Sequence, residues 1–145
     1  MQVSIYALLS RAAARDLYDI YNMIRFKVFD EEEQEMLRRC VIFYQAVSAK
    51  ELNKHFDTSA IDMITKYKVR TELYPVITKR DDFNLDKAKK DIKAFIKEMM
   101  ILDPQEKEFL DMFENKEYLP GLLFKDKEIL NRIKMHPMAL WKTLK

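Results

Sequence analysis

The sequence contains almost no glycine: Gly121 is the only one in 145 residues. Phosphate-cradling loops, dinucleotide-binding fingerprints and tight hairpins all depend on glycine. Only glycine takes positive φ at little cost or lets the backbone approach a phosphate closely. The shortage of glycine therefore argues against these phosphate-binding loops and hairpin-rich folds. Because Leu, Lys, Glu, Met and Ile are abundant, the composition predicts an all-α protein.

Cysteine and histidine are also scarce. Cys40 is the only cysteine, so the chain cannot form an internal disulfide, which is typical of a cytoplasmic protein. Its apolar surroundings, CVIFY, favour a buried structural thiol over a catalytic one. Neither His55 nor His136 stands in a spacing typical of metal ligands, and we expect no metal site built by this chain alone.

Long apolar runs are missing as well, and none approaches the roughly 20 residues that span a bilayer. We therefore expect no membrane segment. The net charge of +2 hides basic blocks: residues 66–93 carry nine basic and five acidic side chains, and residues 125–145 carry six and two. A nucleic-acid-binding domain usually shows a stronger overall bias. RNA binding through these blocks is thus the less favoured alternative.

The pattern of apolar residues predicts a single compact multi-helix bundle over residues 1–145. Asp30, Asn84, Asp103 and Asp126 are expected to cap helices, with Pro104 and Glu106 completing the third start signal. A short extended connector is expected near residues 73–78, because Pro75 breaks a helix there. The expected helices cover residues 2–14, 16–27, 30–47, 57–69, 84–102, 103–115, 126–133 and 138–144.

The stretch RAAARDLYDI, residues 11–20, is the main candidate for chemistry. If one helix runs through it, Arg11, Arg15 and Asp19 are spaced four apart and share a face. Asp16 lies three residues from Asp19. Arginines can hold a phosphate bidentately, and a carboxylate can orient a hydroxyl or a hydrated metal ion. The structural alternative is that Asp16 caps the helix while Arg15 pairs with Asp19.

The same stretch resembles a motif of the AbiE-type abortive-infection toxins, a family of bacterial nucleotidyltransferase-like proteins. Members of this family read Lys-Ile-x-Ala-Leu-x-x-Arg and, a few residues later, Arg-Asp-x-Tyr-Asp. The matching residues here are Ile5, Ala7, Leu8, Arg11, Arg15, Asp16, Tyr18 and Asp19. The segments LYPVITKRDDFNLDKAK, EFLDMF, EYLPGLLF and HPMALWK continue the resemblance to the helical C-terminal region of that family.

The resemblance implies a toxin that takes part in phage defence by transferring a nucleotide group, often onto RNA, and that a partner antitoxin neutralises. It assigns catalysis to Asp16 and Asp19 and nucleotide binding to Arg11 and Arg15. The family's catalytic core, with a Gly-Ser turn and an Asp-x-Asp metal pair, has no counterpart in this sequence. Ser4 stands where the family has lysine. We therefore expect a truncated or split C-terminal half that is not a competent enzyme alone.

An N-terminal catalytic half would then supply the missing wall of the site, and a nucleoside triphosphate and Mg²⁺ would bind only after that completion. For this chain alone, no cofactor is expected. The alternative is a helical interaction module that forms a homodimer or binds a partner subunit. In that case we expect an exposed apolar patch around Val3, Ile5 and Tyr6.

Overall fold

The computed structural model describes residues 13–26, 29–48, 58–77 and 83–144, and all regular structure in these ranges is helical, with no strand. The expected all-α class is therefore confirmed. The expected helix over residues 2–14 lies almost entirely outside the described residues. None of the described helices is both long enough and apolar enough to cross a membrane.

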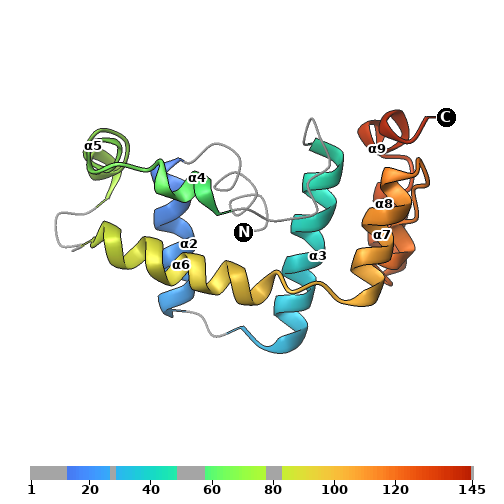
Figure 1. Ribbon diagram of the computed structural model, residues 1–145, viewed down its shortest axis with the longest axis horizontal. Coiled ribbons are helices and arrows are strands. Elements are labelled where there is room, and N and C mark those ends of the chain that lie inside the picture. Colours follow the sequence, from blue (N-terminus) through green and yellow to red (C-terminus); the bar gives the residue numbers. More distant parts are fainter. Residues whose placement is uncertain (1–12, 27–28, 49–57, 78–82, 145) are drawn as a thin grey trace.

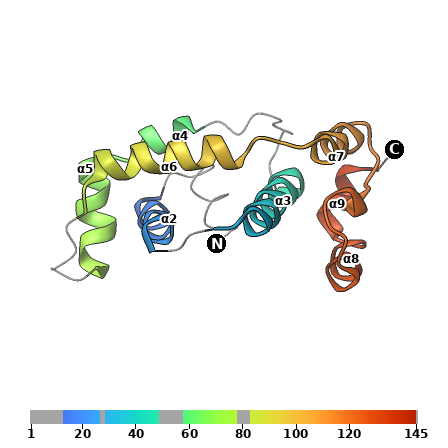
Figure 2. The ribbon, with the colours of Figure 1, turned by 90° about the horizontal axis from the view of Figure 1, so that it is seen from below.

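The first half of the chain contributes helices α2 (Ala14–Phe26), α3 (Glu31–Ser48), α4 (Ser59–Asp62) and α5 (Lys66–Lys68). Helix α5 continues into the π-helix η1 (Val69–Leu73) and the 3-10 helix η2 (Tyr74–Val76). The second half contributes α6 (Leu85–Met99), α7 (Pro104–Glu114), η3 (Pro120–Leu122), α8 (Lys127–Ile133) and α9 (Pro137–Lys142). In both views α3 stands between an end built from α2, α5 and α6 and an end built from α7, α8 and α9 (Figures 1 and 2).

Capping explains where several of these helices begin. Asn84 accepts a hydrogen bond from the Lys87 N–H, and Asp126 accepts bonds from the first turn of α8. The Asp30 carboxylate accepts from the Glu33 N–H at 2.7 Å, at the start of α3. Each side chain satisfies N–H groups that have no partner inside the helix. The four capping residues expected from the sequence, including Asp103 described below, are confirmed.

Residues 57–77 depart from expectation. In place of one helix over 57–69, α4 ends at Asp62, and the chain turns before Thr65 caps α5. In place of an extended connector over 73–78, the backbone stays helical through Val76, and only Ile77 is extended, whereas Thr78 is not described. Pro75 is compatible with this path because it stands in the first turn of η2, where its missing N–H is not needed.

Two hydrophobic clusters hold the described residues together. The first joins α2, the N-terminal half of α3, α4, η1 and α6 around Leu17, Ile61 and Ile92. The second joins the C-terminal half of α3 to α7 and α9 around Ile42, Phe109 and others. Because α3 contributes to both clusters, it fixes the two ends of the molecule relative to each other. Helical periodicity in the sequence predicts an apolar stripe on α6 formed by Leu85, Ala88, Ile92, Phe95, Met99 and Leu102. The structure buries four of these six, and Ile96 is buried in place of Phe95.

Candidate functional site

The exposed face of α2 carries two of the predicted site residues. Arg15 and Asp19 lie one helical turn apart, and both are exposed on the side opposite the buried Leu17. The two do not form an ion pair with each other in the structure. Their charged groups are therefore available to a ligand or a partner approaching α2.

The other predicted residues take different positions. Asp16 is the third residue of α2 and partly buried, so it does not cap the helix, which begins at Ala14. Its carboxylate still suits the first turn, where the helix dipole favours negative charge. Arg11 lies outside the described residues, so its place beside Arg15 stays a prediction. The structure thus brings Arg15 and Asp19 to one face and sets Asp16 on the flank.

Tyr18, the aromatic residue of the motif, points toward the start of α6. Its ring meets the ring of Phe83 edge to face at 5.6 Å, and Tyr21 meets the same ring at 5.9 Å. Such edge-to-face pairs are a favoured arrangement of aromatic rings. The guanidinium of Arg25 lies 5.1 Å from the centre of the Tyr21 ring. This aromatic group connects α2 to the segment that enters α6.

A cleft of about 440 Å³ is lined in part by Phe83. One wall comes from α5, η1 and η2, and the other comes from the residues that begin α6. These elements lie together at one end of the molecule in both ribbon views (Figures 1 and 2). The cleft is lined by two cations, two aromatic rings, two apolar residues, an amide and a carboxylate, namely Lys66, Arg70, Tyr74, Phe83, Val69, Leu85, Asn84 and Asp86.

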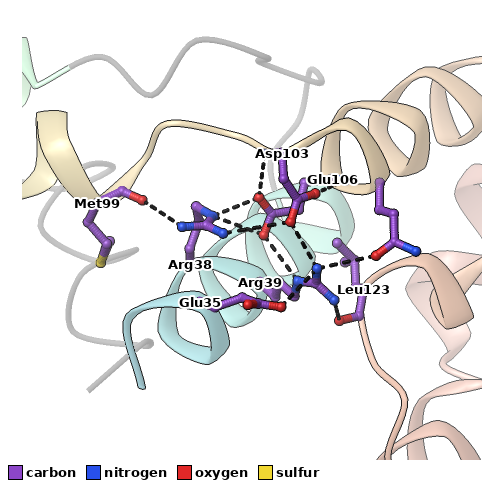
Figure 3. A network of polar contacts seen from close by, with 8 residues as sticks. Glu35, Arg38, Arg39, Met99, Asp103, Glu106 and Leu123 are labelled. Carbon is purple, nitrogen blue, oxygen red and sulfur yellow. Dashed lines mark hydrogen bonds and ion pairs between the residues drawn. The ribbon is translucent and has the colours of Figure 1, made fainter. Parts of the chain in front are cut away.

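A buried polar network lies elsewhere, between α3 and α7 (Figure 3). The fully buried Glu106 carboxylate accepts hydrogen bonds from Arg38 Nε at 2.7 and 2.9 Å and from Arg39 Nε at 3.2 Å. Arg39 also donates to the Leu123 carbonyl and to Asp103 Oδ2, each at 2.9 Å. Because Arg39 itself is buried, this is an internal charge cluster whose groups are satisfied by one another.

The same carboxylates cap α7. Asp103 accepts from the Glu106 N–H and Glu106 accepts from the Asp103 N–H, both at 2.8 Å, which forms a capping box. Burial by itself raises the pKa of Asp103, but hydrogen bonds from Glu106 N–H and Arg39, with the charges of both arginines, hold that pKa below its ordinary value. Burial likewise opposes protonation of Arg39, yet bonding to Asp103 and the surrounding carboxylates leave its pKa raised.

Sequence reasoning found the cap but missed the network. Arg38 and Arg39 are 67 or 68 residues away from Glu106 along the chain. One signal was present: two adjacent arginines, Arg38 and Arg39, interrupt the apolar pattern of α3, and the structure buries Arg39. Such a residue requires an acidic partner. The network explains how this pair of charges is tolerated, and it marks the cluster as structural.

Other polar groups are mostly structural. Cys40, expected to be a buried structural thiol, is only partly buried, and this burial raises the pKa of its thiol, which disfavours a reactive thiolate. His136 precedes α9, and its ring meets Phe43 edge to face at 5.6 Å, whereas His55 lies outside the described residues. Within the described ranges, no group of three or more His, Cys, Asp or Glu residues could hold a metal ion.

The comparisons with known proteins agree with the motif on α2. Residues 5–115 match the family model described as "Nucleotidyl transferase AbiEii toxin, Type IV TA system". The match contains the whole motif, the cleft and the side chains of the α3–α7 network, and it ends just after α7, before the Leu123 carbonyl that Arg39 also contacts. Neither the curated proteins nor the solved structures gave a match.

Proposed function

Because the chain belongs to the AbiEii nucleotidyl transferase toxin family, we propose that it forms the helical part of a nucleotidyl-transfer site in a toxin–antitoxin system of the cytoplasm. A second polypeptide or segment completes this site, and the chain is inactive alone. The single observation that carries the proposal is the exposure of Arg15 and Asp19 one turn apart, opposite the core and within the matched residues. The antitoxin is the expected second partner.

The chemistry assigned to each side chain follows from its charge. Arg15 presents a planar fork of N–H donors, which suits the oxygens of a nucleotide phosphate. Asp19 is exposed, so its carboxylate can orient an acceptor hydroxyl or a water of a hydrated cation. Asp16 is partly buried nearby and would influence the charge of the same region.

These residues fit Mg²⁺ only in part. The ion usually binds one or two carboxylates together with substrate phosphates and waters. Asp19 can supply one such carboxylate, while Asp16 lies on a different flank of α2. When bound to the completed site, Mg²⁺ would neutralise charge on the transferring phosphate. The role derived for this chain is to hold the phosphate through Arg15 and the acceptor through Asp19.

Complementation tests the proposal directly. The chain is mixed with the catalytic half of another family member, which carries the Gly-Ser turn and the Asp-x-Asp pair, and transfer of radiolabelled nucleotide to total RNA is measured. Activity should appear only in the mixture. Arg15→Gln and Asp19→Asn should each lower it by about tenfold or more, equivalent to about 1.4 kcal/mol in the transition state.

The matched control uses a similar pair outside the family match. Glu128 and Arg132 are exposed and spaced four apart on α8, with 3.1 Å between Glu128 Oε1 and Arg132 Nη2. Replacing both by glutamine removes the same two charge types and should leave transfer unchanged. If the mixture stays inactive, or if the α2 variants are no worse than this control, the proposed role of α2 is wrong.

A helical interaction module is the second candidate, and Phe26 favours it. This side chain is 78% exposed at the end of α2, with the Arg25 guanidinium 4.6 Å from its ring centre. An exposed aromatic ring beside an arginine is typical of interface anchors. The patch expected around Val3, Ile5 and Tyr6 lies outside the described residues.

Light scattering at several concentrations distinguishes this candidate. A homodimer held through Phe26 should dissociate in Phe26→Asp and persist in Met63→Asp, which alters a comparably exposed residue after α4. A monomer at every concentration would exclude the homodimer. Repeating the measurement with the antitoxin or the catalytic half would then test the same surface for a different subunit.

A further inference from the structure

The cleft between η1 and the start of α6 has a composition that neither the family motif nor the proposed role of α2 explains. Its volume of about 440 Å³ falls within the range of small-molecule sites. Its lining combines two cations with two aromatic rings, and it includes one carboxylate. These groups belong to separate elements, so the fold brings them together.

The cationic wall is suited to a phosphate. Lys66 and Arg70 are spaced four apart across the junction of α5 and η1, and both are exposed. Lysine supplies a mobile point charge, and arginine supplies a fork that matches two phosphate oxygens. Neither side chain has a hydrogen bond or an ion pair that would have to be broken first.

The backbone of this wall is unusual. Val69–Leu73 is a π-helix, with Arg70 as its second residue. π-helical turns are rare and are frequently found at functional sites. The preceding helix starts at a Thr65 cap that accepts from the Lys68 N–H, which orders the turn before Lys66. The π-helical turn therefore carries Arg70 and directly follows α5, which carries Lys66.

The aromatic rings provide the second part of the site. Tyr74 is 51% exposed, so much of its side chain is accessible to a ligand. Phe83 is held in place by its edge-to-face contacts with Tyr18 and Tyr21, which do not line the cleft. A planar base stacks favourably on such rings whatever its identity. A supported ring and an exposed ring lining one cleft suit a flat heterocycle better than they suit an aliphatic chain.

The opposite wall of the cleft, formed by residues at the start of α6, favours some anions over others. The Asn84 carbonyl oxygen is used by the helix cap, which leaves its amide N–H groups to donate. Asp86 adds a carboxylate that repels a second acid but accepts hydrogen bonds from hydroxyl groups, as acids do from ribose in dinucleotide sites. An acidic peptide would be disfavoured here, and inorganic phosphate would leave the rings and Asp86 unused.

We propose that this cleft binds a nucleoside phosphate, with Lys66 and Arg70 on the phosphate, Tyr74 and Phe83 on the base and Asp86 on the ribose. The site is separate from the exposed face of α2 that carries Arg15 and Asp19. The inference goes beyond the proposed function and stands on the cleft alone. A free nucleotide and a nucleotide within single-stranded RNA share this chemistry.

Calorimetric titration of the chain alone tests the site, with the four ribonucleoside monophosphates, adenosine and inorganic phosphate as probes. At least one monophosphate should bind about tenfold more tightly than adenosine or phosphate, because only it engages both walls. Raising the salt concentration should weaken binding. The proposal is overturned if no monophosphate binds, or if inorganic phosphate binds as tightly.

Variants locate the binding. Lys66→Gln with Arg70→Gln should weaken monophosphate binding by about tenfold or more, and Tyr74→Leu should weaken it less. The control pair, Lys90→Gln with Lys97→Gln, removes two exposed cations of α6 that do not line the cleft. Circular dichroism should show that all variants are folded, since the altered side chains are exposed. Equal losses in the control pair would show general charge attraction and refute the site.

A short single-stranded RNA identifies the source of the nucleotide. If it competes for the cleft and binds more tightly than the monophosphate, the cleft holds a nucleotide of an RNA chain. Equal or weaker affinity indicates a free nucleotide, and either result supports recognition of a nucleoside phosphate. No catalytic half is present in these titrations. Their failure would therefore leave the complementation result, and with it the proposed role of α2, untouched.

Discussion

Glu106 provides the sharpest test of what holds this fold together. Its side chain is fully buried, and its two oxygens accept hydrogen bonds from Arg38, Arg39 and the Asp103 N–H. Glu106→Gln keeps the shape of the side chain but removes its charge. It also replaces an acceptor oxygen by an NH₂ group that faces N–H donors. The variant therefore removes the charge of the one carboxylate to which both guanidiniums donate hydrogen bonds, which leaves Arg39 paired with Asp103 and Glu35 and leaves Arg38 only a 3.8 Å ion-pair contact with Asp103.

The expected loss is about 3 kcal/mol in the free energy of unfolding. Breaking a buried ion pair by removing one partner costs roughly 3–5 kcal/mol, and each hydrogen bond to a charged group contributes about 1.5–3 kcal/mol. The lower figure applies because Gln retains one acceptor and Arg38 is partly exposed. For a chain of this length, 3 kcal/mol corresponds to a decrease of about 10 °C in Tm.

Urea unfolding followed by far-UV circular dichroism measures the loss, with Glu108→Gln as the control. Glu108 stands two residues later on α7, and its side chain is exposed. The control should change the free energy of unfolding by less than about 0.5 kcal/mol. If Glu106→Gln is no more destabilising than Glu108→Gln, then the buried network does not stabilise the junction of α3 and α7, and the reasoning is refuted.

Three further predictions concern single groups. The folded-state pKa of Asp103 is depressed, so its carboxylate stabilises the fold above its unfolded pKa, and this contribution is lost as the pH falls through the folded pKa. The urea concentration at the unfolding midpoint should therefore decrease when the pH is lowered below about 4. The decrease should be less steep in Asp103→Asn. Tyr118→Phe should lower the free energy of unfolding by about 1 kcal/mol, because the Tyr118 hydroxyl donates to the Ile133 carbonyl at 2.6 Å. Burial raises the pKa of Tyr118 to about 12, so its absorbance should change at a higher pH than that of an exposed tyrosine. Arg15→Gln and Asp19→Asn should each change the unfolding free energy by less than about 0.5 kcal/mol, because both side chains are exposed; a larger loss would mean that they hold the fold rather than a ligand.

The sequence predicted features that depend on neighbouring residues. The caps Asp103 and Asn84 follow from side chains that reach N–H groups only three residues away. The stripe of α6 follows from helical periodicity, which needs only one apolar surface to pack on. Within α2, the same periodicity placed Arg15 and Asp19 on one exposed face. Local geometry alone fixes all of these, so no knowledge of the tertiary fold was required.

Features that depend on distant residues were missed. Helical spacing over 57–69 predicts Ile61, Ile64 and Tyr67 on one side of a single helix, but the break after α4 leaves Ile64 buried and Tyr67 exposed. The burial of Arg39 depends on carboxylates more than 60 residues away. The cleft joins residues from the start of α5 to the start of α6, and no single stretch of sequence shows this combination. Tertiary packing decided each case, overriding local preference.

The region beyond the family match completes the second hydrophobic cluster. Phe109, Leu110 and Phe113 lie within the match, on α7, but Leu123, Phe124 and Ala139 that pack with them lie beyond it. Without that later segment, the apolar sides of α3 and α7 would face water, at a cost of roughly 25 cal/mol for each Å² exposed.

Polar contacts add to this dependence. The Leu123 carbonyl accepts from the buried Arg39, and Lys142 donates to the Ala46 carbonyl near the end of α3. The region after residue 115 therefore satisfies a charge that the family-matched region buries. Since α3 also packs on the cluster that contains α2, and Met100 after α6 packs on both clusters, a change in the C-terminal helices can reach the exposed motif through these shared elements. Stability and nucleotide transfer should therefore be measured together for any variant of these helices.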